Sequence, residues 1–177
     1  MPKAPSSTTL TAAAYHEAGH AMMCRLMHLR IASVAVGLDE PDGGEIAHEN
    51  PFRGAGYPSG TRPMTQRQME KAVMLCLAGP MAQRKYLSGA TRGEDGGTFD
   101  LDTALQVAMR FFRSKKTAEA YLSFARAWIE QKFEEPMIWA AVERLASALI
   151  VQRKISGREA EAILRGRSAA SRGRSAA

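Results

Sequence analysis

One segment constrains the fold of this chain more than any other: a proline-free stretch at residues 9–28 that is rich in Ala, Leu and Met. These residue types favour an α-helix, and the Ser and Thr residues just before the stretch can cap its first turn. The stretch contains the sequence HEAGH at residues 16–20, which holds half of the four histidines in the chain. Because side chains four residues apart share one face of a helix, we expect the two imidazoles to point in the same direction.

The remaining patterns predict a mainly α-helical protein with a small β element. The segment IASVAVG at residues 31–37, the turn DEPDGG and the segment EIAHEN predict a hairpin or a pair of edge strands. Thr65 and Gln68 form a capping box for a helix to about Leu77, and Gly79-Pro80 is expected to break this helix or to start a new one. Further helices are expected from Thr98, at about 117–134 and 136–152, and from Ser156, with loops at 49–63 and 91–97.

Length and composition indicate one folded domain. The chain has 177 residues, of which 45% are hydrophobic, and this is enough for a core. No apolar run approaches the roughly 20 residues of a membrane span, and the N-terminus lacks the apolar segment of a secretory signal. Two cysteines are too few for a disulfide framework, so we expect a cytoplasmic protein. We divide the chain into a flexible N-terminus (1–8), a folded domain (9–164) and a disordered tail (165–177).

The positive charge of the chain is concentrated in its tail. The formal net charge is +6, and four arginines of residues 165–177, where RGRSAA occurs twice, supply most of it. Such a segment cannot bury a core, but it could tether the protein to an anionic partner. A second basic run, Arg110, Arg113, Lys115 and Lys116, suits the C-terminal end of a helix. No motif of a DNA- or RNA-binding protein accompanies either run, so nucleic acid is not an expected partner.

The HEAGH sequence is a pattern typical of a metal site. His16 and His20 would present two ring nitrogens to one zinc ion, at Zn–N distances of about 2.0–2.1 Å. Glu17 lies beside them outside the ligand set, where it could take a proton from a water molecule at the metal. Zinc lowers the pKa of such a water toward about 7. The three residues together would suit attack on a carbonyl group.

The third protein ligand has to come from elsewhere in the chain. The longer zinc motif, with Gly three and His six residues after the second histidine, is excluded because Met23 and Leu26 occupy these positions. A carboxylate is the expected alternative. Asp100 and Asp102 are candidates in the first turn of a helix that follows a Gly-rich loop. Two positions along a helix differ by about 200°, so only one of them can face the site.

Four other residues have a weaker claim to a role in this site. Glu94 and Asp95 lie in a polar loop and are expected to be solvated. Cys24 follows His20 by one helical turn and is expected to be a structural thiol in the core. His48 could donate to a developing oxyanion, although a lone histidine at a strand end is more often a surface residue.

Four segments of the chain are similar, in the same order, to segments of one known family. They are AYHEAGHA (14–21), QMEKAVMLCLAGPMAQRKYLSG (68–89), GGTFDLDTALQVA (96–108) and MIWAAVERLASALIVQRKISGREAEAIL (137–164). The family they resemble is FtsH, the ATP-dependent membrane metalloproteases, and the resemblance covers about residues 9–164 of its protease domain. It implies that Asp100 is the third zinc ligand, with Phe99 where the family has Asn. The chain departs from the family at Pro80, in place of Arg, and at Gln83, in place of Glu.

The resemblance implies a helical zinc-metallopeptidase domain that binds one Zn²⁺ per chain. The sequence contains no G-x-x-x-x-G-K-[ST] motif, so no intrinsic ATPase is expected and the substrates would be unfolded or flexible polypeptides. A homo-oligomer and a separate ATPase partner stay open. Two other functions also stay open: a non-catalytic zinc-binding or partner-binding relic of this fold, and an interaction module anchored by the basic tail.

Overall fold

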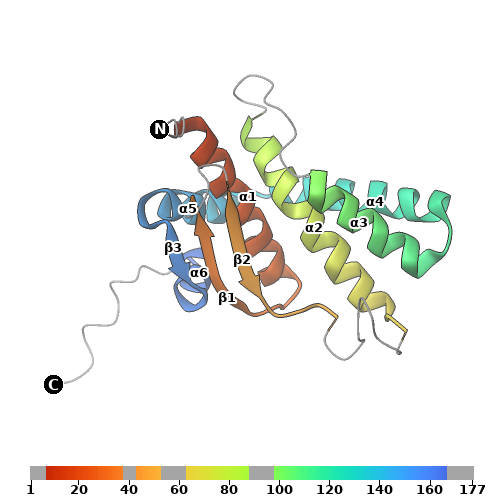
Figure 1. The fold of residues 1–177 in the computed structure, drawn as a ribbon. Helices are drawn as coiled ribbons and strands as arrows, with labels where there is room; N and C mark the ends of the chain where they lie inside the picture. Colours follow the sequence, from red (N-terminus) through yellow and green to blue (C-terminus); the bar gives the residue numbers. More distant parts are fainter. Residues whose placement is uncertain (1–6, 38–42, 53–62, 88–97, 167–177) are drawn as a thin grey trace, which may run out of the picture.

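The computed structural model describes residues 7–37, 43–52, 63–87 and 98–166. These ranges contain six helices and three strands (Figure 1). In chain order the elements are α1 (Ser7–Leu26), β1 (Ile31–Val36), β2 (Gly44–His48), α2 (Gln66–Leu87), α3 (Thr98–Phe112), α4 (Lys115–Glu134), α5 (Pro136–Gln152), β3 (Lys154–Ser156) and α6 (Gly157–Leu164). The prediction of a mainly α-helical protein with a small β element is confirmed. Within the described ranges, no helix has both the length and the apolar character needed to cross a membrane.

The three strands form one antiparallel sheet in the order β2-β1-β3. β1 pairs with β2 so that Ile31 faces His48 and Val36 faces Gly44, and β3 pairs with the other edge of β1. The predicted hairpin is therefore confirmed, and β2 is an edge strand. The sequence did not predict β3, because a strand of three residues with only Ile155 buried is too short to show an alternating pattern.

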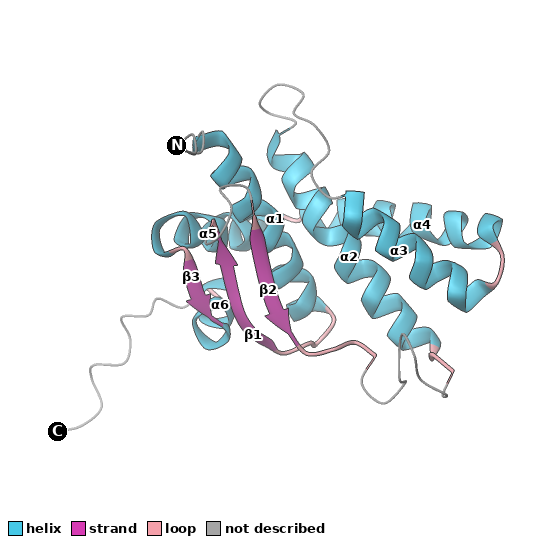
Figure 2. Ribbon diagram, viewed as in Figure 1, coloured by secondary structure: helices cyan, strands magenta, loops and turns pink. Residues whose placement is uncertain are grey.

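The helix α1 is the central element of the fold (Figure 2). It packs against α2 and α5, and the sheet covers a further side of it. The helices α3 and α4 pack against α2 on the side away from the sheet, while α6 packs against β1 and α5. The side chains of Ala14, Ala18 and Ala21 are fully buried along α1. Residues of α1 are therefore held in place by the sheet and by the helices α2 and α5.

The helix α2 runs without a break through Gly79 and Pro80, so the predicted break at this pair is wrong. A proline inside a helix removes the hydrogen bond to the carbonyl four residues earlier and costs about 3 kcal/mol. Residues 77–82 are all buried, on the part of α2 that crosses α1. Most helix stability in a protein comes from this kind of packing. Burial of this face of α2 therefore offsets the local cost of the proline. The sequence shows that cost but not the burial.

Arg153 ends α5 with a strained backbone, at φ 66° and ψ −34°, a conformation that favours glycine. The strain is maintained by two hydrogen bonds, because its N–H donates to the Leu149 carbonyl and its own carbonyl accepts from Val36. We expect Arg153→Gly to raise the free energy of unfolding by about 1 kcal/mol, measured by urea denaturation. Arg153→Ala keeps the strain and should bring no such gain. Equal stabilities of the two variants would contradict this interpretation.

Candidate metal centre

Two histidines of α1 and one aspartate of α3 bring three potential ligand atoms together. His16 Nε2 lies 3.0 Å from His20 Nε2 and 3.0 Å from Asp100 Oδ2, and His20 Nε2 lies 3.5 Å from Asp100 Oδ2. The histidines converge because they are one helical turn apart, and Asp100 reaches them from the first turn of α3. These three side chains, called the His-His-Asp group below, are close enough to share one metal ion.

The other nitrogen of each imidazole is hydrogen-bonded to α2. His20 Nδ1 lies 2.8 Å from the Leu75 carbonyl oxygen, which can only accept, so Nδ1 carries the proton and donates it. His16 Nδ1 donates to Gln83 Oε1 at 2.8 Å. When the rings are neutral, both Nε2 atoms keep a free lone pair within the His-His-Asp group. Metal-binding histidines commonly make such hydrogen bonds, because these fix the ring and its tautomer.

A zinc ion fits these three atoms. Tetrahedral zinc with bonds of about 2.0–2.1 Å separates its ligand atoms by about 3.3 Å, and the measured separations of 3.0, 3.0 and 3.5 Å lie on both sides of this value. Electron-rich atoms at such distances repel one another unless a cation or a proton lies among them. Two histidines and a carboxylate are also a donor set that zinc takes in catalytic sites, which keep one position open.

Without a metal, the charges in the His-His-Asp group shift two pKa values. Burial acts to raise the pKa of Asp100, but hydrogen bonds from His16 and His20 outweigh it and hold the pKa well below its usual range. Burial acts to lower the pKa of His16, but the hydrogen bond to Asp100 and the charge of Glu17 outweigh it and raise the pKa. Asp100 is therefore ionised near neutral pH, in the form that binds a cation.

Glu17 lies on α1 beside the first histidine and is almost completely buried, with 5% of its surface exposed. Burial is the largest cause of the raised pKa of its carboxyl group, and the charges of His20 and His16 act in the opposite direction. A carboxyl group with a raised pKa exchanges protons more readily near neutral pH. Glu17 thus lies within electrostatic range of the His-His-Asp group without belonging to it.

Small residues let α1 and α2 cross closely at the histidines. A Cβ atom built on Gly19 would lie 2.5 Å from Ala82 Cβ and 2.6 Å from the Ala78 carbonyl oxygen. A Cβ atom built on Gly79 would overlap the His20 ring, with Nε2 as the nearest atom. Gly19 therefore permits the approach of the two backbones, and Gly79 leaves room for the ring that supplies one of the three ligand atoms.

Asp102, the other acidic candidate on α3, does not join the His-His-Asp group. Asp102, two residues further along α3, is exposed and contributes no atom to it. This agrees with the rotation of about 200° between the two positions, which lets only one of them face α1. Glu94 and Asp95 lie outside the described residues.

Cys24 and His48 also lie apart from the candidate metal centre. Cys24 is fully buried in the core, where burial raises the pKa of its thiol to about 12, as expected for a structural cysteine. His48 lies at the end of β2 opposite to Gly44, and its Nδ1 donates to the Glu49 carbonyl at 2.8 Å. The end of β2 that lies against Glu17 is Gly44, so the geometry gives no support to the oxyanion role that the sequence left open for His48.

Sequence reasoning missed the groups that orient the two imidazoles. The hydrogen bond between His20 and Leu75 spans 55 residues of sequence, and the one between His16 and Gln83 spans 67. A backbone carbonyl such as that of Leu75 leaves no signal in a sequence. Gln83 does leave one, because it is an amide that directly follows the mostly apolar residues 75–82, and a metal-binding histidine needs such an acceptor.

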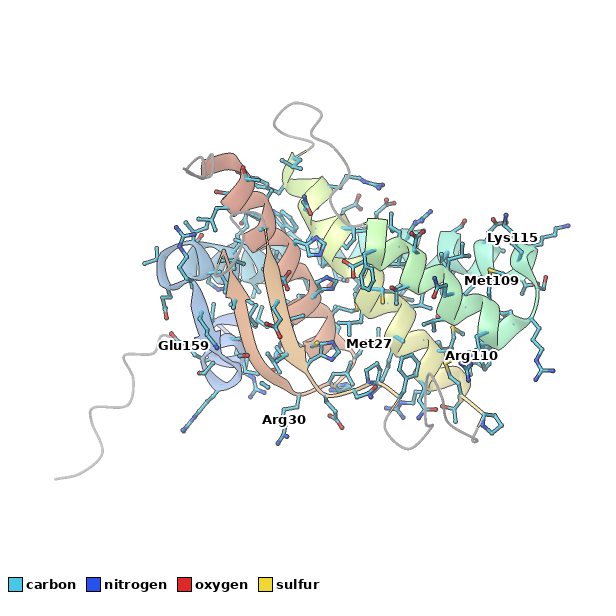
Figure 3. All side chains as sticks on the ribbon, viewed as in Figure 1. Met27, Arg30, Met109, Arg110, Lys115 and Glu159 are labelled. Atoms are coloured by element: carbon cyan, nitrogen blue, oxygen red, sulfur yellow. The ribbon has the colours of Figure 1, made fainter. Side chains whose placement is uncertain are left out.

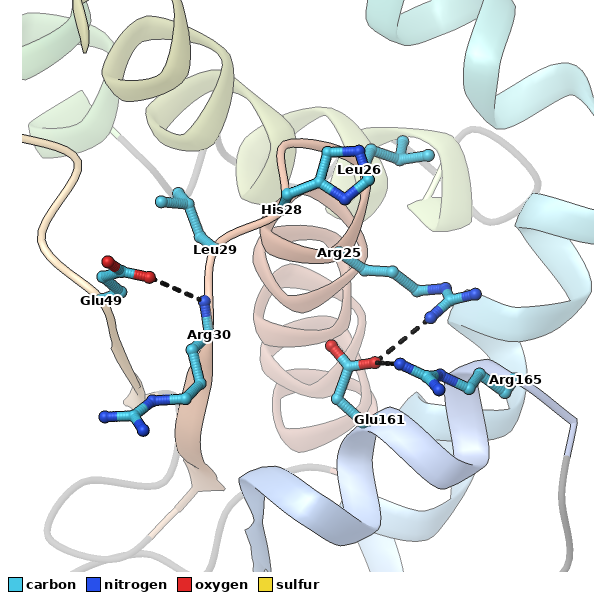
Figure 4. Close-up of a pocket in the computed structure, with 8 residues that line it drawn as sticks. All are labelled: Arg25, Leu26, His28, Leu29, Arg30, Glu49, Glu161 and Arg165. Atoms are coloured by element: carbon cyan, nitrogen blue, oxygen red, sulfur yellow. Dashed lines mark hydrogen bonds and ion pairs between the residues drawn. The ribbon is translucent and has the colours of Figure 1, made fainter.

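A pocket of about 830 Å³ lies at the C-terminal end of α1, away from the His-His-Asp group (Figure 4). Within it, Glu161 Oε2 accepts hydrogen bonds from Arg25 Nη1 and Arg165 Nη2, each at 3.2 Å. Figure 4 shows both guanidinium groups turned toward this carboxylate. The ion pair between α1 and α6 thus joins the C-terminal helix to the central one.

The basic run at the junction of α3 and α4 is a surface feature. Arg110 and Lys115 project from this end of the molecule (Figure 3), and all four of its cations are exposed. Phe111 and Phe112, between them in sequence, pack against the core. The run therefore fits a solvated helix end with inward-facing aromatic residues.

The comparisons with known proteins add no family to this description. No model of a known protein family matches the chain, and no curated protein sequence matches it significantly. The similarity to the FtsH protease domain, the zinc ion and the peptidase activity therefore stay predictions, and they rest on the sequence segments and on the geometry of the His-His-Asp group.

Proposed function

We propose that this protein is a zinc-dependent metalloendopeptidase of the FtsH type. His16, His20 and Asp100 would hold one zinc ion. The observation that carries the proposal is the convergence of their three lone-pair atoms, combined with the hydrogen bonds that hold the far side of each imidazole. When bound there, zinc would lower the pKa of a water molecule and polarise a carbonyl group.

Glu17 is the general base in this proposal. Its buried carboxylate would accept a proton from the attacking water and later donate it to the leaving amine. Burying an ionisable side chain costs free energy unless the group is paired, hydrogen-bonded or neutralised. A relic of the fold that only binds zinc would have no chemical need for a buried Glu17. This favours catalysis over the non-catalytic alternative.

The edge strand β2 supports a polypeptide substrate. Within the described residues, β1 is the strand that pairs with β2, on one of its two edges. An extended peptide can add to the other edge through main-chain hydrogen bonds. Because β2 begins against Glu17, a peptide held on this edge would pass near the carboxylate. Strand addition needs an extended chain, so the proposed substrates are unfolded or flexible polypeptides.

The test combines zinc content with cleavage of fluorescently labelled casein. We expect about one zinc per chain by elemental analysis, and cleavage that is lost on chelation and returns when zinc is added. Glu17→Gln keeps the shape of the side chain but removes the base. We expect it to retain zinc and to lower kcat by about 10²–10⁴-fold.

The matched control is Glu119→Gln, which changes an exposed acid of α4 that is not part of the His-His-Asp group and should cleave at the wild-type rate. An active Glu17→Gln protein would contradict the assigned mechanism. A wild-type protein that binds zinc but cleaves no member of a peptide library would instead support the non-catalytic relic.

A further inference from the structure

The first residue of β2 lies directly against the side chain of Glu17. A Cβ atom built on Gly44 would lie 2.5 Å from Glu17 Cγ, 2.5 Å from Oε1 and 2.8 Å from Cδ. Real Cβ atoms essentially never come within 3.0 Å of another heavy atom, so any other residue at position 44 would force a movement. The three nearest atoms all belong to one side chain, and it is the side chain assigned as the general base.

The backbone of Gly44 does not itself require glycine. The positive-φ glycines among the described residues are Gly37 and Gly166, and Gly44 is not one of them. It forms a regular antiparallel pair with Val36 in the sheet. Glycine in a strand is otherwise unfavourable, because it loses more backbone freedom than other residues and supplies no side chain to pack. A glycine that its own backbone does not need points to a close approach by another group.

The carboxylate is the part of this contact that is free to move. The backbone of α1 around Glu17 is fixed, because Ala14, Ala18 and Ala21 are fully buried on it. The strand β2 is fixed by its pairing with β1. A methyl group at position 44 would therefore turn the Glu17 side chain away from its present position, in which its charge interacts with both histidines.

We propose that Gly44 is a positioning residue: because position 44 carries no side chain, the Glu17 carboxylate can occupy the space beside the His-His-Asp group that a Cβ atom would otherwise fill. This inference rests on the proposed function, in which Glu17 is the base. In this assignment Gly44 is not a metal ligand, and it acts on the proton transfer through the side chain of Glu17.

The experiment measures Gly44→Ala for zinc content, for kcat and KM on casein, and by ¹³C NMR of the Glu side-chain carboxyl groups in the metal-free full-length chain. We expect wild-type zinc content, a similar KM and a kcat lowered by about 100-fold, toward that of Glu17→Gln. We also expect the Glu17 carboxyl resonance, assigned with Glu17→Gln, to move. Ser33→Ala in the neighbouring strand β1 is the control and should leave kcat and this resonance unchanged.

Two double variants keep the proposal falsifiable. In the Glu17→Gln background, Gly44→Ala should lower the residual kcat no further, since it acts through that side chain. If Gly44→Ala reduces stability, the same change in the Glu17→Ala background should reduce it much less, because the contacted atoms are gone. Equal losses in both backgrounds, or an unchanged kcat and resonance in Gly44→Ala, would overturn the proposal. A wild type without turnover would reject the proposed function, while the resonance and the stability comparison would still decide whether Gly44 positions Glu17.

Discussion

Gly79→Ala is expected to weaken zinc binding by about 100-fold or more while α2 stays helical. Replacing glycine by alanine inside a helix ordinarily stabilises a protein by about 1 kcal/mol. At this position the three atoms nearest to the new Cβ all belong to the His20 ring, and the closest is Nε2. Loss of an outer partner of a metal-binding histidine already costs 10–100-fold in affinity, so displacing Nε2 itself should cost at least as much. Competition with a chromophoric zinc chelator measures the affinity, and circular dichroism reports the helix content.

A double variant separates this effect from general damage to the crossing of α1 and α2. In the His20→Ala background the ring is absent, so Gly79→Ala should no longer clash and should raise the free energy of unfolding by up to about 1 kcal/mol. In the wild-type background the same substitution should be neutral or destabilising. Wild-type zinc affinity in Gly79→Ala, or equal destabilisation in both backgrounds, would show that the glycine does not reserve the space of the ring.

The parts of the fold that the sequence predicted correctly depend on interactions between near neighbours. The capping box is one example, since Thr65 N–H donates to Gln68 Oε1 at 2.9 Å and Gln68 N–H donates to Thr65 Oγ1 at 3.3 Å. The hairpin of β1 and β2 is another, because turn residues separate two segments that favour strands. The error at Pro80 has the opposite origin. Its local cost is visible in the sequence, while the burial against α1 that offsets it is not.

The candidate site likewise combines features that the sequence predicts with features that only the tertiary structure shows. The pairing of His16 with His20 follows from helix periodicity, so the residues themselves indicate it. The choice of Asp100 over Asp102 needed a family resemblance, because the rotation of α3 relative to α1 is a tertiary property. The contacts of Gly44 and Gly79 with side chains of α1 could not be predicted at all. A glycine leaves no chemical signal of its own, and its role appears only when the neighbouring element is placed.

Asp100→Asn is expected to abolish zinc binding in the micromolar range, although the substituted amide has nearly the same size. Asp100 supplies the anionic oxygen that lies 3.0 Å from His16 Nε2 and 3.5 Å from His20 Nε2, and a neutral amide replaces it poorly in a zinc ligand set. Free zinc at 100 times the dissociation constant adds about 2.7 kcal/mol to the free energy of unfolding. Zinc should therefore raise the melting temperature of the wild type and leave that of Asp100→Asn unchanged.

With Asp102→Asn as a second variant, the experiment decides which of the two candidate acids of α3 is the third zinc ligand. The two positions share one turn of α3 and undergo the same chemical change, but Asp102 is exposed and lies outside the His-His-Asp group. Asp102→Asn should therefore keep both the zinc affinity and the zinc-dependent rise in melting temperature. The reverse pattern would mean that α3 is rotated by about 200° in the zinc-bound protein. Retention of zinc by both variants would mean that neither residue is the third ligand. The His-His-Asp group would then not be the zinc site.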